Sequence, residues 1–263
     1  MIYTVCMNLS IRLQEIDRLK IRLDAFRPLS SNQTNNLKRL FDVDLTYNST
    51  AIEGNTLTLQ ETRVVLLDGI TIGGKTTREH LEILNHKEAI DYVEILSQKN
   101  IDDYTKSDIL ALHSIVLRGI DSENAGRYRN VPVYVRLKDG SVHQFCDPLK
   151  ILDEMKYFLK WLNSCKEVHP VLFAAEAHTR FVCIHPFVDG NGRTARLLMK
   201  LRLIHFGYPP AVIKMSKRTD YLDSIEKWQQ DSSKIEFLMM LADSVYESLT
   251  LYLETLEKNI IWK

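Results

Sequence analysis

The segment HPFVDGNGRTARLL, residues 185–198, combines a histidine, an acidic residue, two glycines and two arginines just before an apolar run. That run predicts a helix that begins near Asn191. The first N–H groups of a helix lack partners within it and carry partial positive charge. Gly190 and Gly192 have no side chains, so the backbone there can approach a bound anion closely. The segment therefore predicts a phosphate-binding turn at the start of a helix.

Charged side chains flank this turn. Arg193 and Arg196 lie three positions apart, and both can reach phosphate oxygens from neighbouring faces of the helix. Asp189 suits Mg²⁺, because a carboxylate repels phosphate unless a cation lies between them. Histidine titrates near neutrality, so His185 can accept a proton from a hydroxyl group. Together these groups indicate phosphoryl or nucleotidyl transfer to a hydroxyl. The alternative is a helix-capping turn with a core histidine and solvated arginines.

The composition is that of an ordinary soluble globular protein. Of the 263 residues, 45% are hydrophobic and 26% are charged, and 34 Lys and Arg balance 34 Asp and Glu. Zero net charge argues against non-specific binding to nucleic acid or to an anionic membrane. The apolar stretch at the N-terminus is too short for a signal peptide or a membrane span. The cysteines show no metal-binding spacing and indicate reduced thiols, so we expect a cytoplasmic protein. They are Cys6, Cys146, Cys165 and Cys183.

Apolar residues recur at helical spacing along most of the chain. The first helix is predicted over residues 9–26, and residues 27–36 (RPLSSNQTNN) are predicted to form a polar connection. Thr58 and Glu61 form a capping box that starts a helix through about Leu67. Further helices are predicted over residues 77–98, 105–118, 149–164, 170–184 and 191–206, with one or two more over 219–258.

Residues 131–145 (VPVYVRLKDGSVHQF) differ from this pattern. They alternate apolar and polar side chains, and Asp139-Gly140 supplies a turn, so they predict a β-hairpin. Nothing in the middle of the sequence marks a domain boundary. The sequence therefore predicts an all-α domain with one β-hairpin.

Residues 185–196 (HPFVDGNGRTAR) match the pattern H-x-F-x-D/E-G-N-G-R-x-x-R at every fixed position, so the chain resembles the Fic family. The resemblance implies an all-α Fic fold and the transfer of AMP from ATP to a protein hydroxyl. It implies that His185 is the general base, within a catalytic set that includes Asn191 and Arg193. It also implies that Phe187 anchors the loop in the core.

The same resemblance assigns ATP and Mg²⁺ as cofactors. It places the α- and β-phosphates on residues 190–193 and the γ-phosphate on Arg196. A branch of toxins that phosphorylate instead carries a lysine where this chain has Gly192, so that branch fits poorly. Asp189 is the expected Mg²⁺ ligand. The full set of expected nucleotide-binding residues is Asp189, Gly190, Asn191, Gly192, Arg193, Thr194, Ala195, Arg196, Ser141, Val142, His143, Tyr221 and Gln229.

A second segment, STAIEGN at residues 49–55, resembles the inhibitory motif S/T-x-x-x-E-G/N of this family. Ser49 and Glu53 are four positions apart and share a helix face. Gly54 is a natural left-handed cap that places Glu53 in the last turn. A carboxylate there opposes the helix dipole by roughly 0.3–1 kcal/mol. The resemblance pairs Glu53 with Arg196, and the alternative is a surface glutamate before a turn.

The flanking segments NTLTLQET, AGRYR and GYPP also resemble this subgroup, so the resemblance covers about residues 40–255. We expect an N-terminal helical segment at residues 1–39 and a Fic domain at 40–263. The inhibitory helix is expected at about 45–54. The flap, at about 131–145, is expected to pair its edge with the backbone of a target protein. The resemblance also allows self-modification and a homodimer, and no nucleic-acid or membrane partner is expected.

A competing motif, GITIGGKT at residues 69–76, matches the phosphate-loop pattern of NTPases. No βαβ alternation follows it. The capping box at Thr58 also predicts that the preceding VVLL ends a helix. We therefore favour an autoinhibited protein adenylyltransferase that modifies a Ser, Thr or Tyr hydroxyl. Two alternatives stay open: removal of AMP from a modified protein at the same site, and a non-enzymatic nucleotide-binding interaction module.

Overall fold

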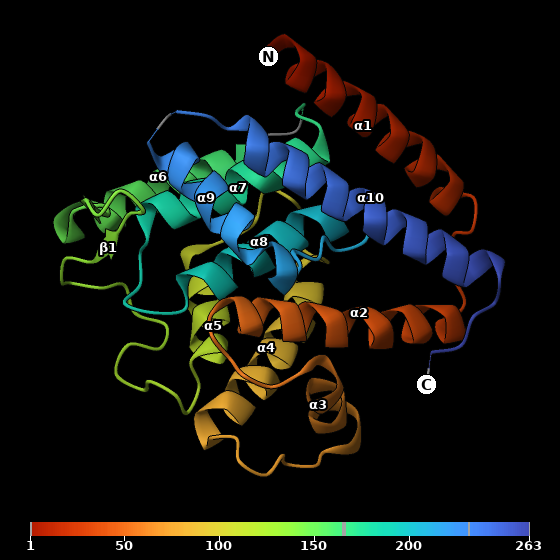
Figure 1. The fold of residues 1–263 in the computed structure, drawn as a ribbon, viewed down its shortest axis with the longest axis horizontal. Helices are drawn as coiled ribbons and strands as arrows, with labels where there is room; N and C mark the ends of the chain where they lie inside the picture. Colours follow the sequence, from red (N-terminus) through yellow and green to blue (C-terminus); the bar gives the residue numbers. More distant parts are fainter. Residues whose placement is uncertain (1, 165–166, 231, 263) are drawn as a thin grey trace.

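The structure, a computed structural model, describes residues 2–164, 167–230 and 232–262. Nearly all regular structure in this part of the chain is helical (Figure 1). The helices are α1 (Ile2–Asp24), α2 (Ser31–Ile52), α3 (Leu59–Arg63), α4 (Thr77–Leu96), α5 (Lys106–Val116), α6 (Ile151–Ser164), α7 (Pro170–Ile184), α8 (Asn191–His205), α9 (Arg218–Gln229) and α10 (Ile235–Glu257). Short helical turns cover Val64–Asp68, Pro148–Lys150 and Met215–Lys217. The predicted fold class, all-α with one hairpin, is confirmed.

Helix α8 is the central helix of the fold. It packs against α7, α4 and α5, and Figure 1 shows it surrounded by other helices. Every residue from Arg193 through Leu203 is buried. A helix covered on all sides needs a core around it, and apolar side chains such as Leu197, Leu201 and Phe181 supply that core. The N-terminus of α8 is therefore held firmly in place.

The N-terminal helix belongs to the same core. Helix α1 lies along α10 (Figure 1) and contributes Leu9, Ile16 and Leu23 to the main hydrophobic cluster. It begins earlier than the predicted residue 9. The expected boundary at residue 39 falls inside α2.

The prediction of a polar connection over residues 27–36 is wrong beyond Ser30. A capping box starts α2 at that point: the Gln33 N–H donates to Ser30 Oγ (3.3 Å), and the Ser30 N–H donates to Gln33 Oε1 (3.0 Å). Helix α2 then buries Leu37 and Phe41. This packing outweighs the weak helix propensity of its Asn- and Ser-rich first turns. The predicted inhibitory helix at 45–54 is therefore the C-terminal part of the 22-residue helix α2, which ends at Ile52, so Glu53 caps the helix instead of lying in its last turn.

The phosphate-loop interpretation is wrong. The run VVLLD forms a π-helical turn that continues α3 and ends at Gly69, whose φ is +68°. The sheet among the described residues is the antiparallel hairpin of β1 (Tyr134–Arg136) and β2 (Val142–Gln144). Lys75 donates to the carbonyl oxygen of Thr56 at 2.6 Å, so its ammonium group is engaged in holding a loop.

None of the helices in the described ranges is both long and apolar enough to span a bilayer. Cys146 and Cys183 are free thiols, whereas Cys165 and the side chain of Cys6 lie outside what the structure describes.

Candidate active site

The segment HPFVDG forms a tight loop between α7 and α8. His185 ends α7 with a left-handed backbone (φ +52°), which is uncommon for a residue with a side chain. Phe187 is fully buried, as expected, and its ring stacks on His113 with 3.5 Å between centroids. The Asn191 side chain accepts from the Phe187 N–H (3.0 Å) and donates to the Phe187 carbonyl (2.8 Å). These contacts close the loop on itself and fix its shape.

His113 holds the loop in place through hydrogen bonds of both ring nitrogens. Its Nε2 lies 2.9 Å from the carbonyl oxygen of Asp189, and its Nδ1 accepts from the Gly126 N–H at 2.9 Å. These partners require the proton on Nε2, so the tautomer is assigned from the hydrogen bonds. Burial lowers the pKa of His113 to about 4. It is therefore a neutral core histidine.

His185 borders the cleft as a neutral imidazole. Its ring stacks on Phe145 with 3.8 Å between centroids. Burial lowers the pKa of His185 to about 4, against the opposing effect of the Val182 carbonyl. A general base must be unprotonated before it acts. His185 meets that condition across the physiological pH range.

Arg129 ties the loop to the hairpin. It is 4% exposed, and its guanidinium donates to three backbone carbonyls. One belongs to His185 (2.7 Å), and the others belong to Val131 (2.8 Å) and Cys146 (2.6 Å), which flank the two strands. The Arg129 N–H also donates to the carbonyl of Pro186 at 3.0 Å. One buried side chain thus fixes the hairpin relative to His185.

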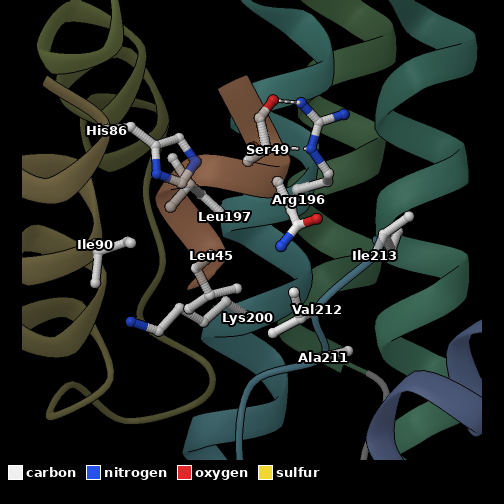
Figure 2. Close-up of a pocket in the computed structure, with 11 residues that line it drawn as sticks. Leu45, Ser49, His86, Ile90, Arg196, Leu197, Lys200, Ala211, Val212 and Ile213 are labelled. Atoms are coloured by element: carbon white, nitrogen blue, oxygen red, sulfur yellow. Dashed lines mark hydrogen bonds between the residues drawn. The ribbon is translucent and has the colours of Figure 1, made fainter. Parts of the chain in front are cut away.

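Arg196 is bound to the end of α2. Its Nε donates to Ser49 Oγ (2.9 Å), and its Nη2 donates to the Ser49 carbonyl (2.8 Å) and to Glu53 Oε1 (2.7 Å). Figure 2 shows Ser49 and Arg196 facing each other from α2 and α8. Glu53 is the C-cap of α2, and Gly54 follows with a φ of +102°. The predicted shared face of Ser49 and Glu53 and the left-handed Gly54 are confirmed.

The backbone at Gly192 lies against this pair. A Cβ atom there would lie 2.3 Å from Glu53 Oε1 and 3.1 Å from Arg196 Nη1. Any side chain at this position would displace the carboxylate from the guanidinium. The glycine thus allows both a close backbone approach to an anion and the contact between Glu53 and Arg196.

Arg193 is poorly satisfied in the structure. It is 2% exposed, and its Nε and Nη1 have no hydrogen-bond partner among the described residues. Its Nη2 lies 3.3 Å from Asp189 Oδ1, and its Nη1 lies 3.7 Å from Glu82 Oε1. Buried charged donors are costly unless they are paired. These donors lack a hydrogen-bond partner beside the start of α8, so they fit an anionic ligand such as phosphate.

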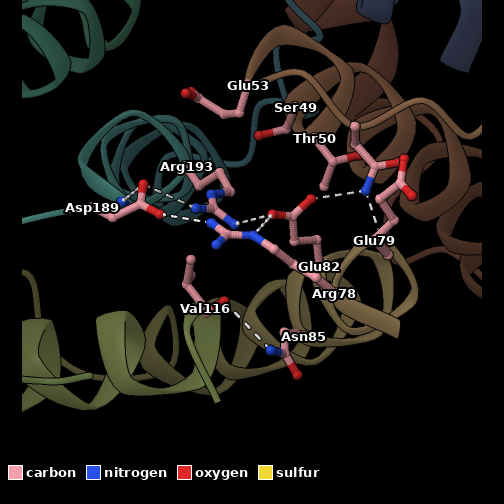
Figure 3. Close-up of polar contacts among 12 residues, drawn as sticks. Ser49, Thr50, Glu53, Arg78, Glu79, Glu82, Asn85, Val116, Asp189 and Arg193 are labelled. Carbon is pink, nitrogen blue, oxygen red and sulfur yellow. Dashed lines mark hydrogen bonds and ion pairs between the residues drawn. The ribbon is translucent and has the colours of Figure 1, made fainter. Parts of the chain in front are cut away.

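Asp189 lies in a small network of charges (Figure 3). Arg78 contacts Asp189 Oδ2 at 3.1 Å and Glu82 Oε1 at 3.2 Å. Asn55, two residues after Glu53, donates to Glu82 Oε2 at 2.9 Å. No group of three His, Cys, Asp or Glu side chains with metal-binding geometry occurs in the described ranges. The half-buried carboxylate of Asp189 fits Mg²⁺, which keeps several waters and takes phosphate oxygens as ligands.

A cleft of about 520 Å³ opens beside His185, Gly192 and Arg196, and its volume suits a nucleotide-sized ligand. Of the predicted contact residues, Gly192, Arg196, Tyr221 and Gln229 border the cleft, whereas Asp189, Gly190, Asn191 and Arg193 are not among its described lining residues. The hairpin contributes residues 135–138 to the lining, and Ser141, Val142 and His143 are not among the lining residues found in the described part of the chain. The lining further includes Glu53, Phe145, Val182, His185, Gly192, Arg196, Arg218, Leu222 and Glu226.

Thr194 and Ala195 are fully buried within α8. The Thr194 N–H already donates to the carbonyl of Gly190 at 3.0 Å. The structure thus brings His185, Asp189, Arg193 and Arg196 to one end of α8, and any contact from Thr194 or Ala195 to a nucleotide stays a prediction.

The sequence pattern indicated no role for Arg129, Arg78 or Glu82. Arg129 ends the segment AGRYR, directly before the hairpin. This position was the one local feature that could have indicated a role for Arg129. Arg78 and Glu82 form an ordinary i, i+4 pair on α4. Their contacts with Asp189 and Arg193 span more than a hundred residues, so no local pattern could indicate them.

Comparison with known proteins identifies a family for this chain. The Fic/DOC family pattern matches residues 103–203. The protein adenylyltransferase Fic of Drosophila melanogaster is 38% identical over 244 residues, which cover 92% of this chain and 48% of the relative. The protein of the same name from Aedes aegypti is 40% identical over 209 residues, which cover 79% of this chain and 41% of the relative. The chain spans somewhat less than half the length of these curated relatives.

Two solved structures are similar over nearly the whole chain. A fragment of Fic-1 from C. elegans has a TM-score of 0.84 at 31% identity, covering 98% of this chain and 75% of that one. A Fic domain containing signaling protein from Bacteroides thetaiotaomicron has a TM-score of 0.88 at 27% identity, covering 95% and 99%. The chain belongs to the Fic/DOC family.

Proposed function

We propose that this chain is an autoinhibited protein adenylyltransferase, which transfers AMP from ATP to a Ser, Thr or Tyr hydroxyl of a target protein. One observation carries the proposal. Two buried arginines, Arg193 and Arg196, meet at the start of α8 beside His185, and Glu53 pairs with Arg196. The curated relatives named as adenylyltransferases support the same activity.

The proposed reaction uses the residues as follows. The target hydroxyl attacks the α-phosphorus, a new O–P bond forms, and pyrophosphate leaves with the electrons of the broken P–O bond. The neutral imidazole of His185 takes the hydroxyl proton. The N–H groups at the start of α8 and the Arg193 donors that lack a hydrogen-bond partner stabilise charge on the phosphates. Mg²⁺ held through Asp189 would add charge neutralisation to the bound triphosphate.

The proposed inhibitory contact is the ion pair of Glu53 and Arg196. If Arg196 binds the γ-phosphate, Glu53 competes for the same guanidinium and repels the phosphate. ATP then binds with its α-phosphate out of line for attack. A misplacement near 1 Å can cost about 10²-fold in rate. The proposed autoinhibition therefore requires no large conformational change, because the Glu53 carboxylate takes the place of the γ-phosphate at Arg196.

The hairpin is the proposed docking site for the target. Leu137 with Ser141 and Val133 with Phe145 are bonded pairs, and Val135 lies opposite His143. Alternation along an antiparallel ladder then turns the Tyr134 amide outward, where an added strand could bond it.

Self-modification, a homodimer and a cytoplasmic location are further expectations from the sequence.

Removal of AMP is a second candidate function. The Glu53 side chain is 37% exposed and borders the cleft together with His185. A carboxylate in that place can orient a water molecule toward a phosphate. The test is loss of AMP from a modified target in the presence of the unaltered chain.

The proposed activity is tested with radiolabelled ATP, Mg²⁺ and cell lysate. Glu53→Gly should label proteins, or itself, more strongly than the wild type. The double variant Glu53→Gly with His185→Ala should lose the label while still binding ATP. If Glu53→Gly binds ATP but transfers nothing to any protein, the chain is better described as a nucleotide-binding interaction module.

A further inference from the structure

The Arg196 guanidinium has a hydrogen-bond partner outside α2. Its Nη1 donates to the hydroxyl of Tyr221 at 3.1 Å. Ser49 and Glu53, its other partners among the described residues, both belong to the end of α2. Tyr221 belongs to α9. When Glu53 releases Arg196, the contact with Tyr221 does not depend on α2 and can persist.

The direction of the Tyr221 hydroxyl is set by His178. The distance between Tyr221 Oη and His178 Nε2 is 2.8 Å. Burial, together with the nearby charge of Arg196, lowers the pKa of His178 to about 3, so the ring is neutral. Arginine can only donate, so the Tyr221 oxygen accepts from Arg196. The Tyr221 O–H is then assigned as the donor to His178 Nε2, because a neutral His178 can accept it and no other acceptor for this hydroxyl is found among the described residues. The proton of His178 is therefore assigned to Nδ1.

The pair is also held rigidly. Tyr221 is 2% exposed and His178 is fully buried. The His178 ring stacks on Phe237 with 4.8 Å between centroids. Burial raises the pKa of Tyr221, so the phenol keeps its proton and remains a neutral acceptor for the arginine. A hydroxyl in such packing cannot turn away without leaving both neighbours unpaired.

We infer that Tyr221, oriented by His178, is a positioning residue that keeps Arg196 directed into the cleft after Glu53 has released it. Through Arg196, Tyr221 sets the preference of the site for a triphosphate over a diphosphate. This inference rests on the proposed function, in which Arg196 binds the γ-phosphate. It adds to the sequence-based expectation that Tyr221 binds the nucleotide, because the Tyr221 hydroxyl is engaged with Arg196 and His178.

The test compares ATP and ADP binding by calorimetry in the Glu53→Gly background. Tyr221→Phe removes the hydroxyl and keeps the ring. Because a hydrogen bond to a charged group is lost, ATP affinity should fall about tenfold. ADP affinity should stay within about twofold, since ADP has no γ-phosphate for Arg196 to bind. In the Glu53→Gly, Arg196→Ala background, Tyr221→Phe should change neither affinity, because its effect acts through the arginine.

The matched control is Tyr104→Phe. Tyr104 is 4% exposed, and its hydroxyl lies 3.3 Å from Nδ1 of His205, so this variant also breaks a buried tyrosine–histidine contact. It should leave both affinities unchanged. Thermal unfolding of the two variants separates a loss of fold from a loss of positioning.

Three results would overturn the inference: equal loss of ATP and ADP affinity in Tyr221→Phe, no loss of either, or a loss that persists without Arg196. If only the proposed function is wrong, the result differs. Tyr221→Phe should then still reduce the preference for ATP over ADP, but Glu53→Gly should transfer no AMP. If Glu53→Gly binds no ATP at all, both the proposed function and the inference are wrong.

Discussion

Replacing Ser49 with alanine should partly relieve the proposed inhibition of AMP transfer. The change removes the 2.9 Å hydrogen bond from Arg196 Nε to Ser49 Oγ, which is buried. The bonds of Arg196 to the Ser49 carbonyl and to Glu53 remain. A hydrogen bond to a charged group contributes about 1.5–3 kcal/mol, and we take about 1.5 kcal/mol because two contacts persist. That value corresponds to about a tenfold rise in AMP transfer.

The assay is the initial rate of AMP addition, followed by intact mass spectrometry with ATP and Mg²⁺. Alanine is the better helix former, so α2 should stay folded. Ser244→Ala is the matched control, because Ser244 is a buried helical serine that donates to the carbonyl of Met240 at 2.9 Å. The expected order of rates is wild type and Ser244→Ala lowest, Ser49→Ala next, and Glu53→Gly highest. A Ser49→Ala rate equal to that of the wild type, with ATP bound equally, would refute the reasoning.

Three further predictions concern the chemistry and the docking of the target. His185→Ala in the Glu53→Gly background should lower transfer by about 10²–10⁴-fold and leave ATP affinity nearly unchanged; near-full transfer would show that another group is the base. Because the pKa of His185 is about 4, its neutral form persists at higher pH, and transfer should be flat from about pH 6 to about 8 and fall toward pH 4. A rate midpoint near 6.5 would instead indicate an imidazole with an ordinary pKa. Tyr134→Pro should weaken target modification more than ATP binding, because it removes an outward amide from β1; equal loss of both would indicate a purely structural hairpin.

Local signals predicted the elements that carry the site. Pro170 at the first position of α7 and the turn before Asn191 fixed two helices closely. The Asp139-Gly140 turn indicated the hairpin, although its paired strands are only three residues each. The start of α2 was missed, because its first turns are rich in Ser and Asn and the helix is stabilised by burial of Leu37 and Phe41.

Contacts between distant segments could not be predicted from local patterns. The i, i+4 spacing of Ser49 and Glu53 placed them on one face, but only the resemblance connected that face to Arg196, 143 residues beyond Glu53. The hold of Arg129 on the hairpin and the engagement of Tyr221 with His178 have no periodic signal. Such contacts arise from packing around α8, which depends on the whole chain.

The central claim is that Glu53 restrains transfer by holding Arg196. The most direct test is a double-mutant cycle of AMP transfer with the wild type, Glu53→Gly, Arg196→Ala and the double variant, with ATP binding measured in each. The account predicts that Glu53→Gly raises the rate by about 10²-fold and that Arg196→Ala removes most of this gain. A gain that is equally large without Arg196 would contradict the claim, because Glu53 would then act on something other than the arginine it contacts.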